Sequence, residues 1–166
     1  MPSYFFDSSA LVKRYHVEDG SAWVRSICDP RAHSPLYLAE LAHVEVIAAL
    51  YRAGQREHLH PSFVASMVNT FERHLTLSNP ARPAPVYRLI PVSSVIFALA
   101  ARLCGRYQDA RPHPLRSLDA IQLVAGLLAA TALSDELVFV TSDVRLTAIA
   151  ALEGFRVMDP RYPLRP

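Results

Sequence analysis

The chain has 166 residues, of which 51% are hydrophobic, so we expect one folded globular domain over residues 1–166 and not a disordered chain. Its formal net charge of +2 gives only weak support for a polyanionic partner. Its two cysteines have no metal-binding spacing, the YFF run is too short for a signal peptide, and no run approaches the roughly 18 apolar residues of a membrane helix. These features predict a cytoplasmic protein without a membrane segment.

Strand and helix patterns alternate along the chain. In chain order they predict a strand at 3–6, helices at 8–15 and 21–28, a strand at 34–38, helices at 39–53 and 61–75, a strand at 86–92, helices at 93–107 and 117–133, a strand at 137–142, a helix at 143–153 and a strand at 155–159. Gly54 and Gly154 are expected to end helices. Such alternation predicts a three-layer α/β/α fold with a central, mostly parallel sheet of about four to five strands.

Four acidic residues stand in apolar surroundings. Asp7, Asp119 and Asp143 lie at or near points where helices are expected to begin, and Glu45 interrupts the apolar helical run LAHVEVIAAL. Taken singly, the three aspartates are well explained as helix caps or as partners of a helix dipole. Glu45 is harder to explain in this way, because a carboxylate in a buried helix needs a partner.

The expected topology suggests that the acids converge. Asp7 and Asp143 follow strands directly, and ligands of open parallel sheets bind beyond the carboxyl ends of the strands. A site made only of carboxylate oxygens, without His or Cys, favours Mg²⁺ or Mn²⁺ over zinc. The residues therefore predict a hard-metal site that is suited to phosphodiester hydrolysis.

Four motifs, in the order FFDSSALVKRY, AHVEVIAAL, LRSLDAIQLVAG and VFVTSDVRLTAIAALEGFRVMDP, resemble the PIN-domain ribonucleases, and among them the VapC-type toxins of toxin–antitoxin pairs. The resemblance implies a PIN-like fold and a Mg²⁺-dependent endoribonuclease that acts on RNA, is inhibited by a small antitoxin and commonly forms a homodimer. By motif, the catalytic metal ligands would be Asp7, Glu45, Asp119 and Asp143. Ser9 and Thr141 would support these acids.

Arginines precede the third motif. Arg111 and Arg116 are expected to bind the phosphates of RNA, whereas Arg102 and Arg106 are better explained as solvated residues of a helix end. Tyr107 or His113 could stack on an unpaired base. The main alternative to a nuclease is a non-catalytic PIN-like binding module whose acids serve only as helix caps.

Overall fold

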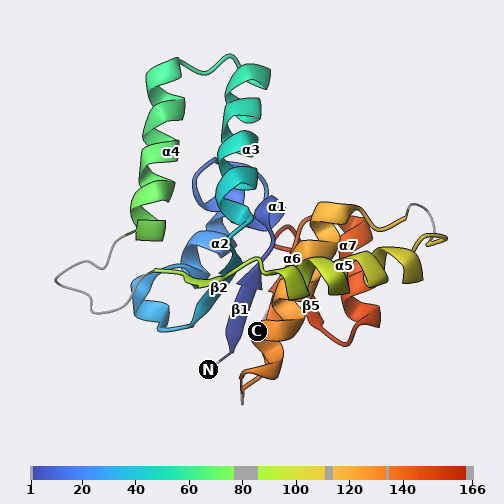
Figure 1. Ribbon diagram of the computed structural model, residues 1–166. Helices are drawn as coiled ribbons and strands as arrows, with labels where there is room; N and C mark the ends of the chain where they lie inside the picture. The colour runs from blue at the N-terminus through green and yellow to red at the C-terminus, as the bar shows by residue number, and fades with distance from the viewer. Residues whose placement is uncertain (1, 77–85, 111–113, 134, 164–166) are drawn as a thin grey trace.

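A five-stranded parallel sheet forms the centre of the computed structural model, which describes residues 2–76, 86–110, 114–133 and 135–163 (Figure 1). The strands, in the spatial order β3-β2-β1-β4-β5, are β3 (Arg88–Ile90), β2 (Leu36–Ala39), β1 (Ser3–Phe6), β4 (Leu137–Val140) and β5 (Arg156–Met158). Every neighbouring pair is parallel, with Phe5 of β1 opposite both Tyr37 and Phe139. The carboxyl ends of all five strands therefore meet at one edge.

Helices connect the strands. They are α1 (Ser8–Leu11), the 3-10 turn η1 (Val12–Arg14), α2 (Ser21–Ile27), the 3-10 turn η2 (Pro30–Ala32), α3 (Ala42–Arg56), α4 (Pro61–Thr76), α5 (Ser94–Arg106), α6 (Ser117–Thr131) and α7 (Val144–Leu152). Helices α3 and α4 form a hairpin that projects beyond the carboxyl edge of the sheet (Figure 1). No helix among the described residues is both long and apolar enough to cross a bilayer.

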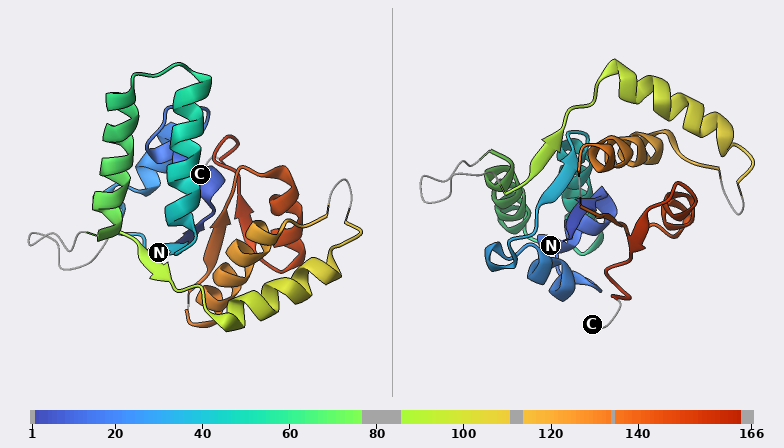
Figure 2. Two further views of the ribbon diagram at one scale, coloured as in Figure 1. Left: turned by 45° about the horizontal axis from the view of Figure 1, so that its top comes forward. Right: turned by 90° about the horizontal axis from the view of Figure 1, so that it is seen from below.

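The two faces of the sheet bury separate hydrophobic cores, because successive side chains of a strand point to opposite faces. Phe6, Leu38 and Val140 pack with α1, α2, α3 and α4 on one face. Phe5 and Phe139 stack at 5.3 Å between ring centroids and pack with α5, α6 and α7 on the other face (Figure 2). This arrangement confirms the predicted three-layer α/β/α fold.

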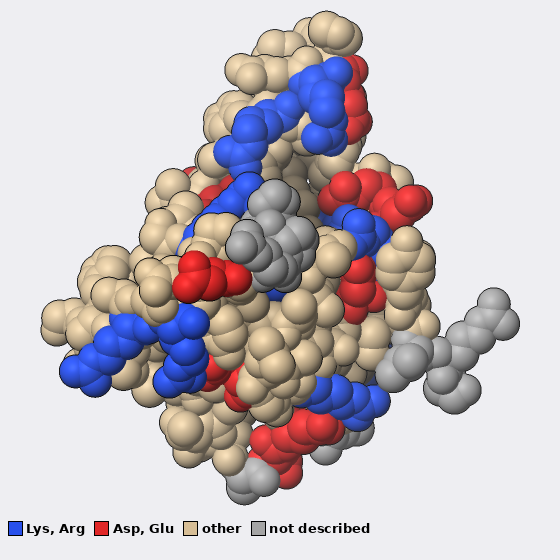
Figure 3. All heavy atoms as spheres, turned by 90° about the vertical axis from the view of Figure 1, so that its right-hand side faces the viewer, with Lys and Arg blue, Asp and Glu red and all other residues tan. Residues whose placement is uncertain are grey.

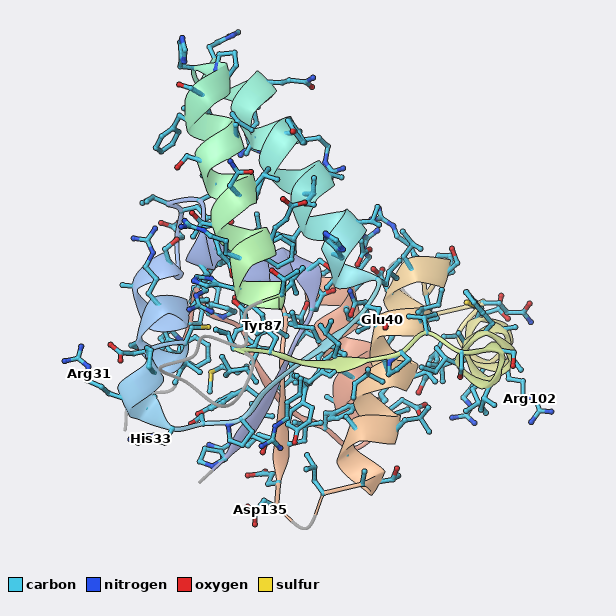
Figure 4. The ribbon with its side chains drawn as sticks, turned by 60° about the vertical axis from the view of Figure 1, so that its left-hand side comes forward. Arg31, His33, Glu40, Tyr87, Arg102 and Asp135 are labelled. Atoms are coloured by element: carbon cyan, nitrogen blue, oxygen red, sulfur yellow. The ribbon has the colours of Figure 1, made fainter. Side chains whose placement is uncertain are left out.

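The predicted bounds of the third helix were wrong at both ends. Ala39 is the last residue of β2, and Glu40 lies in the turn before α3, where its carboxylate accepts a hydrogen bond from the Val92 backbone at 3.2 Å (Figure 4). The helix also continues past Gly54 to Arg56, and α4 packs closely against it at Gly54. A Cβ at Gly54 would lie 2.5 Å from a methyl group of Val64. This glycine therefore serves close helix packing and does not end the helix.

Other differences are local. The helix expected at 8–15 tightens into the 3-10 turn η1 after Leu11. The strand expected at 86–92 is limited to β3, and Tyr87 before it is buried against Arg14 and Tyr15. Gly154 follows α7 with φ of +92°, in the left-handed region, as expected for its predicted position.

Candidate functional site

The four acids come from four separate segments. Asp7 directly follows β1 and caps α1, and Asp143 follows β4 and caps α7. Asp119 and Glu45 lie in the first turns of α6 and α3. The charges of Asp7, Asp143 and Glu45 all act on the carboxyl of Asp119, so the fold brings the four acids near one another at the carboxyl edge of the sheet.

Asp7 is buried and held by hydroxyl groups. Its Oδ2 accepts hydrogen bonds from the Ser9 backbone N–H at 3.2 Å, from Ser9 Oγ and from Thr141 Oγ1 at 3.0 Å. The supporting positions predicted for Ser9 and Thr141 are thus in direct contact with the acid. Among the described residues no hydrogen bond reaches Oδ1 of Asp7, which leaves this atom available to a ligand.

The same hydroxyls join the loops that follow β1 and β4. Ser9 Oγ accepts a hydrogen bond from the Ser142 backbone N–H at 3.0 Å, and Thr141 Oγ1 accepts one from the Asp143 N–H at 3.1 Å. Asp7 and Asp143 are therefore positioned by one connected network, although they lie 136 positions apart in the sequence.

Glu45 has two donors that the sequence analysis missed. Its Oε2 accepts hydrogen bonds from Ser8 Oγ and from Gln122 Nε2, both at 2.6 Å. Gln122 is fully buried, and its Oε1 has no partner among the described residues. A signal was present: Gln122 is the one polar residue in AIQLVAG, and it stands three residues after Asp119 on the same face of α6.

Glu45 does not lie in the middle of a buried helix, as the sequence analysis expected. It lies in the first turn of α3, where a helix dipole would favour its charge, and Val44 beside it is largely exposed. What sets it apart from a surface acid is therefore its contact with Ser8 and Gln122, and not burial in the middle of a helix.

Asp143 has a cationic partner that was also missed. Its Oδ2 accepts a hydrogen bond from Arg145 Nη2 at 3.1 Å, and its Oδ1 accepts bonds from the backbone N–H groups of Arg145 and Leu146 at 2.8 and 3.3 Å. Burial opposes ionisation of Asp143, but the hydrogen bonds from Arg145 and Leu146 and the charge of Arg145 together outweigh burial and lower the pKa of this carboxyl.

Asp7 and Asp119 behave in the opposite way. Burial, and then the charge of Glu45, raise the pKa of Asp7. Burial, and then the charges of Asp7 and Asp143, raise the pKa of Asp119 to about 6. An acid that serves only a helix N-terminus has its ionised form stabilised and its pKa lowered. Burial outweighs the hydrogen bonds to Asp7 and the charge of Arg116 near Asp119, so capping alone does not account for these two acids.

The donor set fits a hard cation in charge and in chemistry, because it consists of carboxylate oxygens supported by hydroxyls. In the described conformation, however, no three His, Cys, Asp or Glu side chains of residues 2–76, 86–110, 114–133 and 135–163 form a ready-made metal site. Two of the acids are turned to protein partners, Glu45 to Gln122 and Asp143 to Arg145.

Of the two predicted RNA-binding arginines, Arg116 lies among the described residues and Arg111 does not. Arg116 is exposed at the N-cap of α6, and its charge acts on Asp119; Arg111 lies outside the described residues. Arg106 Nη1 and the Tyr107 hydroxyl both donate to Glu153 Oε1, at 2.8 and 2.7 Å, and so tie α5 to the end of α7.

Arg102 points away from the sheet into solvent (Figure 4). On the side that carries α5 and α7, basic side chains are mixed with acidic ones and form no large basic surface among the described residues (Figure 3).

Comparison with known proteins reveals similarity only at the level of structure. No protein-family profile matches the chain, and no curated protein has a significantly similar sequence. PAE2754 from Pyrobaculum aerophilum superimposes with a TM-score of 0.62 and 14% identity, over 95% of this chain and 89% of that one.

Two VapBC structures are also similar. Rickettsia felis VapBC2, bound to a DNA fragment from its promoter, gives a TM-score of 0.57 at 9% identity, over 96% of this chain and 98% of that one. DNA-bound VapBC from Salmonella typhimurium gives 0.59 at 13% identity, over 96% and 99%. This chain therefore has the fold of the VapBC structures, which confirms the PIN-like fold that its four motifs predicted.

Proposed function

We propose that this protein is a Mg²⁺-dependent endoribonuclease and the toxin of a toxin–antitoxin pair. The observation that carries the proposal is the convergence of Asp7, Glu45, Asp119 and Asp143 at the carboxyl edge of a sheet that has the fold of VapBC structures. The raised pKa values of Asp7 and Asp119 support it, since burial opposes the ionised forms of these acids and a bound cation would stabilise them.

The four acids would hold Mg²⁺, or Mn²⁺ in its place. When bound, the cation would polarise the scissile phosphate and lower the pKa of a water molecule. Asp7 would offer its Oδ1, because its Oδ2 is occupied by Ser9 and Thr141. Asp143 would have to exchange part of its contact with Arg145 for the cation.

Arg116 would hold a phosphate of the RNA close to Asp119, and Arg111 is proposed to assist it. Arginine suits this role because its guanidinium matches phosphate geometry. Substitution of Arg116 by Gln should raise the KM for RNA and reduce the salt dependence of binding by about one unit of slope. An unchanged slope would remove Arg116 from the interface.

The partners are proposed on the likeness in fold. Because the similar structures are VapBC proteins, we propose that a small antitoxin binds this chain and that the chain forms a homodimer. Co-expression with a candidate VapB-type antitoxin, followed by size-exclusion chromatography with light scattering, tests both proposals.

The decisive experiment is cleavage of a panel of tRNA and single-stranded RNA by purified protein with Mg²⁺, Mn²⁺ or EDTA. Asp7→Asn retains an acceptor for Ser9 and Thr141, so it should remain folded while it loses cleavage. Asp135→Asn is the matched control, because Asp135 is exposed at the opposite edge of the sheet, before β4 (Figure 4). Cleavage that persists in Asp7→Asn or in EDTA would contradict the proposal.

A non-catalytic binding module remains the second candidate, and one observation favours it: Asp7 and Asp143 do cap α1 and α7. The two candidates differ in metal binding. A nuclease site should show a saturable rise in melting temperature with Mn²⁺, whereas helix caps alone should show none.

A further inference from the structure

A hollow of about 200 Å³ lies between α4 and the turn η1, away from the four acids. Arg14 and Tyr15 line it from the η1 side, and Phe63, Met67 and His74 line it from α4. Ser66 and Thr70 of α4 also line it, so its walls combine aromatic and apolar side chains with two hydroxyls around one guanidinium group. The proposed function gives no role to this pocket.

Arg14 is shielded from solvent by neutral groups only. Its Nη1 donates to the Tyr87 hydroxyl and its Nη2 to the Cys28 carbonyl at 3.4 Å. The guanidinium also lies over the rings of Tyr87 and Tyr15, at 5.3 and 5.8 Å from their centroids. None of these partners carries a negative charge, since burial raises the pKa values of Tyr15 and Tyr87 well above the usual range of a tyrosine hydroxyl.

Arg14 differs in this respect from the other shielded cations. Each of the other Lys and Arg side chains that is not exposed, within the described ranges, pairs with a carboxylate: Lys13 with Glu18 at 3.2 Å, Arg145 with Asp143 at 3.1 Å and Arg161 with Asp159 at 2.6 Å. No described carboxylate forms an ion pair with Arg14, and the remaining segments of the chain contain no Asp or Glu. A shielded cation without a counter-charge is costly, and an anion in the adjoining pocket would offset that cost.

The pocket also limits what the anion can be. It offers a single formal charge, because His74 is neutral at pH 7: burial, and then the charges of Arg14 and Arg73, lower its pKa to about 4. One charge matches a monoanion better than a phosphate dianion. The ring of Phe63 and the thioether of Met67 favour an apolar body. An enclosed cavity of about 150 Å³ holds benzene, and this hollow of about 200 Å³, which is open to solvent, has room for one ring of that size.

We propose that this pocket binds a small apolar monocarboxylate, with the carboxylate on Arg14 and the apolar group between Phe63 and Met67. The site is separate from the proposed nuclease site. Tests of RNA cleavage and of metal binding therefore neither support nor refute this proposal.

Benzoate is the probe, and its binding to the full chain is followed by ¹H–¹⁵N NMR. We expect saturable shifts confined to the amides of residues 13–15 and 63–74, with a Kd on the order of 1 mM for a ligand of this size. Benzamide, which has the same shape without the charge, should bind at least about tenfold more weakly, because a charge-assisted bond is lost. Inorganic phosphate should give no saturable shift at these amides.

Two variants test the role of Arg14. Arg14→Met should weaken benzoate binding at least about tenfold, and Arg52→Met, at an exposed arginine that does not line the pocket, should leave the binding unchanged. If Arg14→Met does not fold, Ser66→Phe replaces it as the test. Ser66 lines the pocket from an exposed position, so a phenyl ring there would close the pocket and should abolish benzoate binding. Equal binding of benzoate and benzamide, or full benzoate binding by a folded Arg14→Met or Ser66→Phe protein, would overturn the proposal.

Discussion

Replacing Asp119 by Asn should stabilise the metal-free protein at neutral pH. In the folded chain the pKa of Asp119 is raised from 3.8 to about 6 by burial, and then by the charges of Asp7 and Asp143. At 1.36 kcal/mol per pH unit, this rise corresponds to about 3 kcal/mol. Because the side chain is partly exposed, solvent screening reduces the expected effect to about 2 kcal/mol.

The sign follows from proton linkage. The raised pKa of Asp119 means that the folded state holds this proton more tightly than the unfolded state does. The resulting contribution to stability is fully present below pH 3.8 and is lost as the pH rises through about 6. Asn does not titrate, so the stability of Asp119→Asn relative to the wild type should rise by about 2 kcal/mol between pH 4 and pH 7.5.

Urea unfolding in EDTA at the two pH values measures this difference. The single tryptophan, Trp23, packs edge-on against Tyr4 at 6.2 Å and provides a fluorescence signal for unfolding. Asp135→Asn controls for the loss of an exposed acid and should show no such change with pH. A constant difference between Asp119→Asn and the wild type at both pH values would refute the electrostatic reasoning.

Adding Mn²⁺ should reverse the order of the two proteins. At 100 times its Kd, a cation bound only to the folded wild type stabilises it by about 2.7 kcal/mol. Asp119→Asn should gain much less, because it lacks one of the proposed ligands. Equal stabilisation of both proteins by Mn²⁺ would show that Asp119 is not a ligand.

Three further predictions test the packing and the site. Gly54→Ala should destabilise the protein by about 1–2 kcal/mol in urea unfolding, because its Cβ would meet Val64 at 2.5 Å. Gly105→Ala should instead raise the free energy of unfolding by up to about 1 kcal/mol, because there is open space around Gly105. Gln122→Leu should reduce the Mn²⁺ affinity measured by calorimetry about tenfold, because the hydrogen bond from Gln122 to Glu45 is lost. Its effect on the free energy of unfolding should be smaller, because the substitution also removes the unpartnered Oε1. Mn²⁺ affinity should fall as the pH drops below about 6, where the proton of Asp119 competes with the cation, and a flat profile between pH 7.5 and pH 5 would contradict this.

Local patterns in the sequence determined much of the architecture. The β-branched and aromatic run LVFV predicted β4, Asp143 was recognised as the cap of α7, and Gly154 adopts the left-handed conformation expected after that helix. These features depend on residues a few positions apart, so a linear reading finds them. The alternation of strands and helices likewise indicated the parallel sheet, and the sheet in turn indicated the edge at which the acids meet.

Only the tertiary structure decided which groups touch. The register of β1 with β4 places Thr141 on Asp7, and a contact between the first turn of α3 and α6 places Gln122 on Glu45, across 77 positions of sequence. The sequence alone predicts that α3 ends at Gly54. In the structure α3 continues past this residue, and the glycine allows the close approach of α4. The physical reason is that propensities and caps act within one or two helical turns. Hydrogen bonds, charge coupling and steric fit between distant segments arise only once the hydrophobic cores have formed.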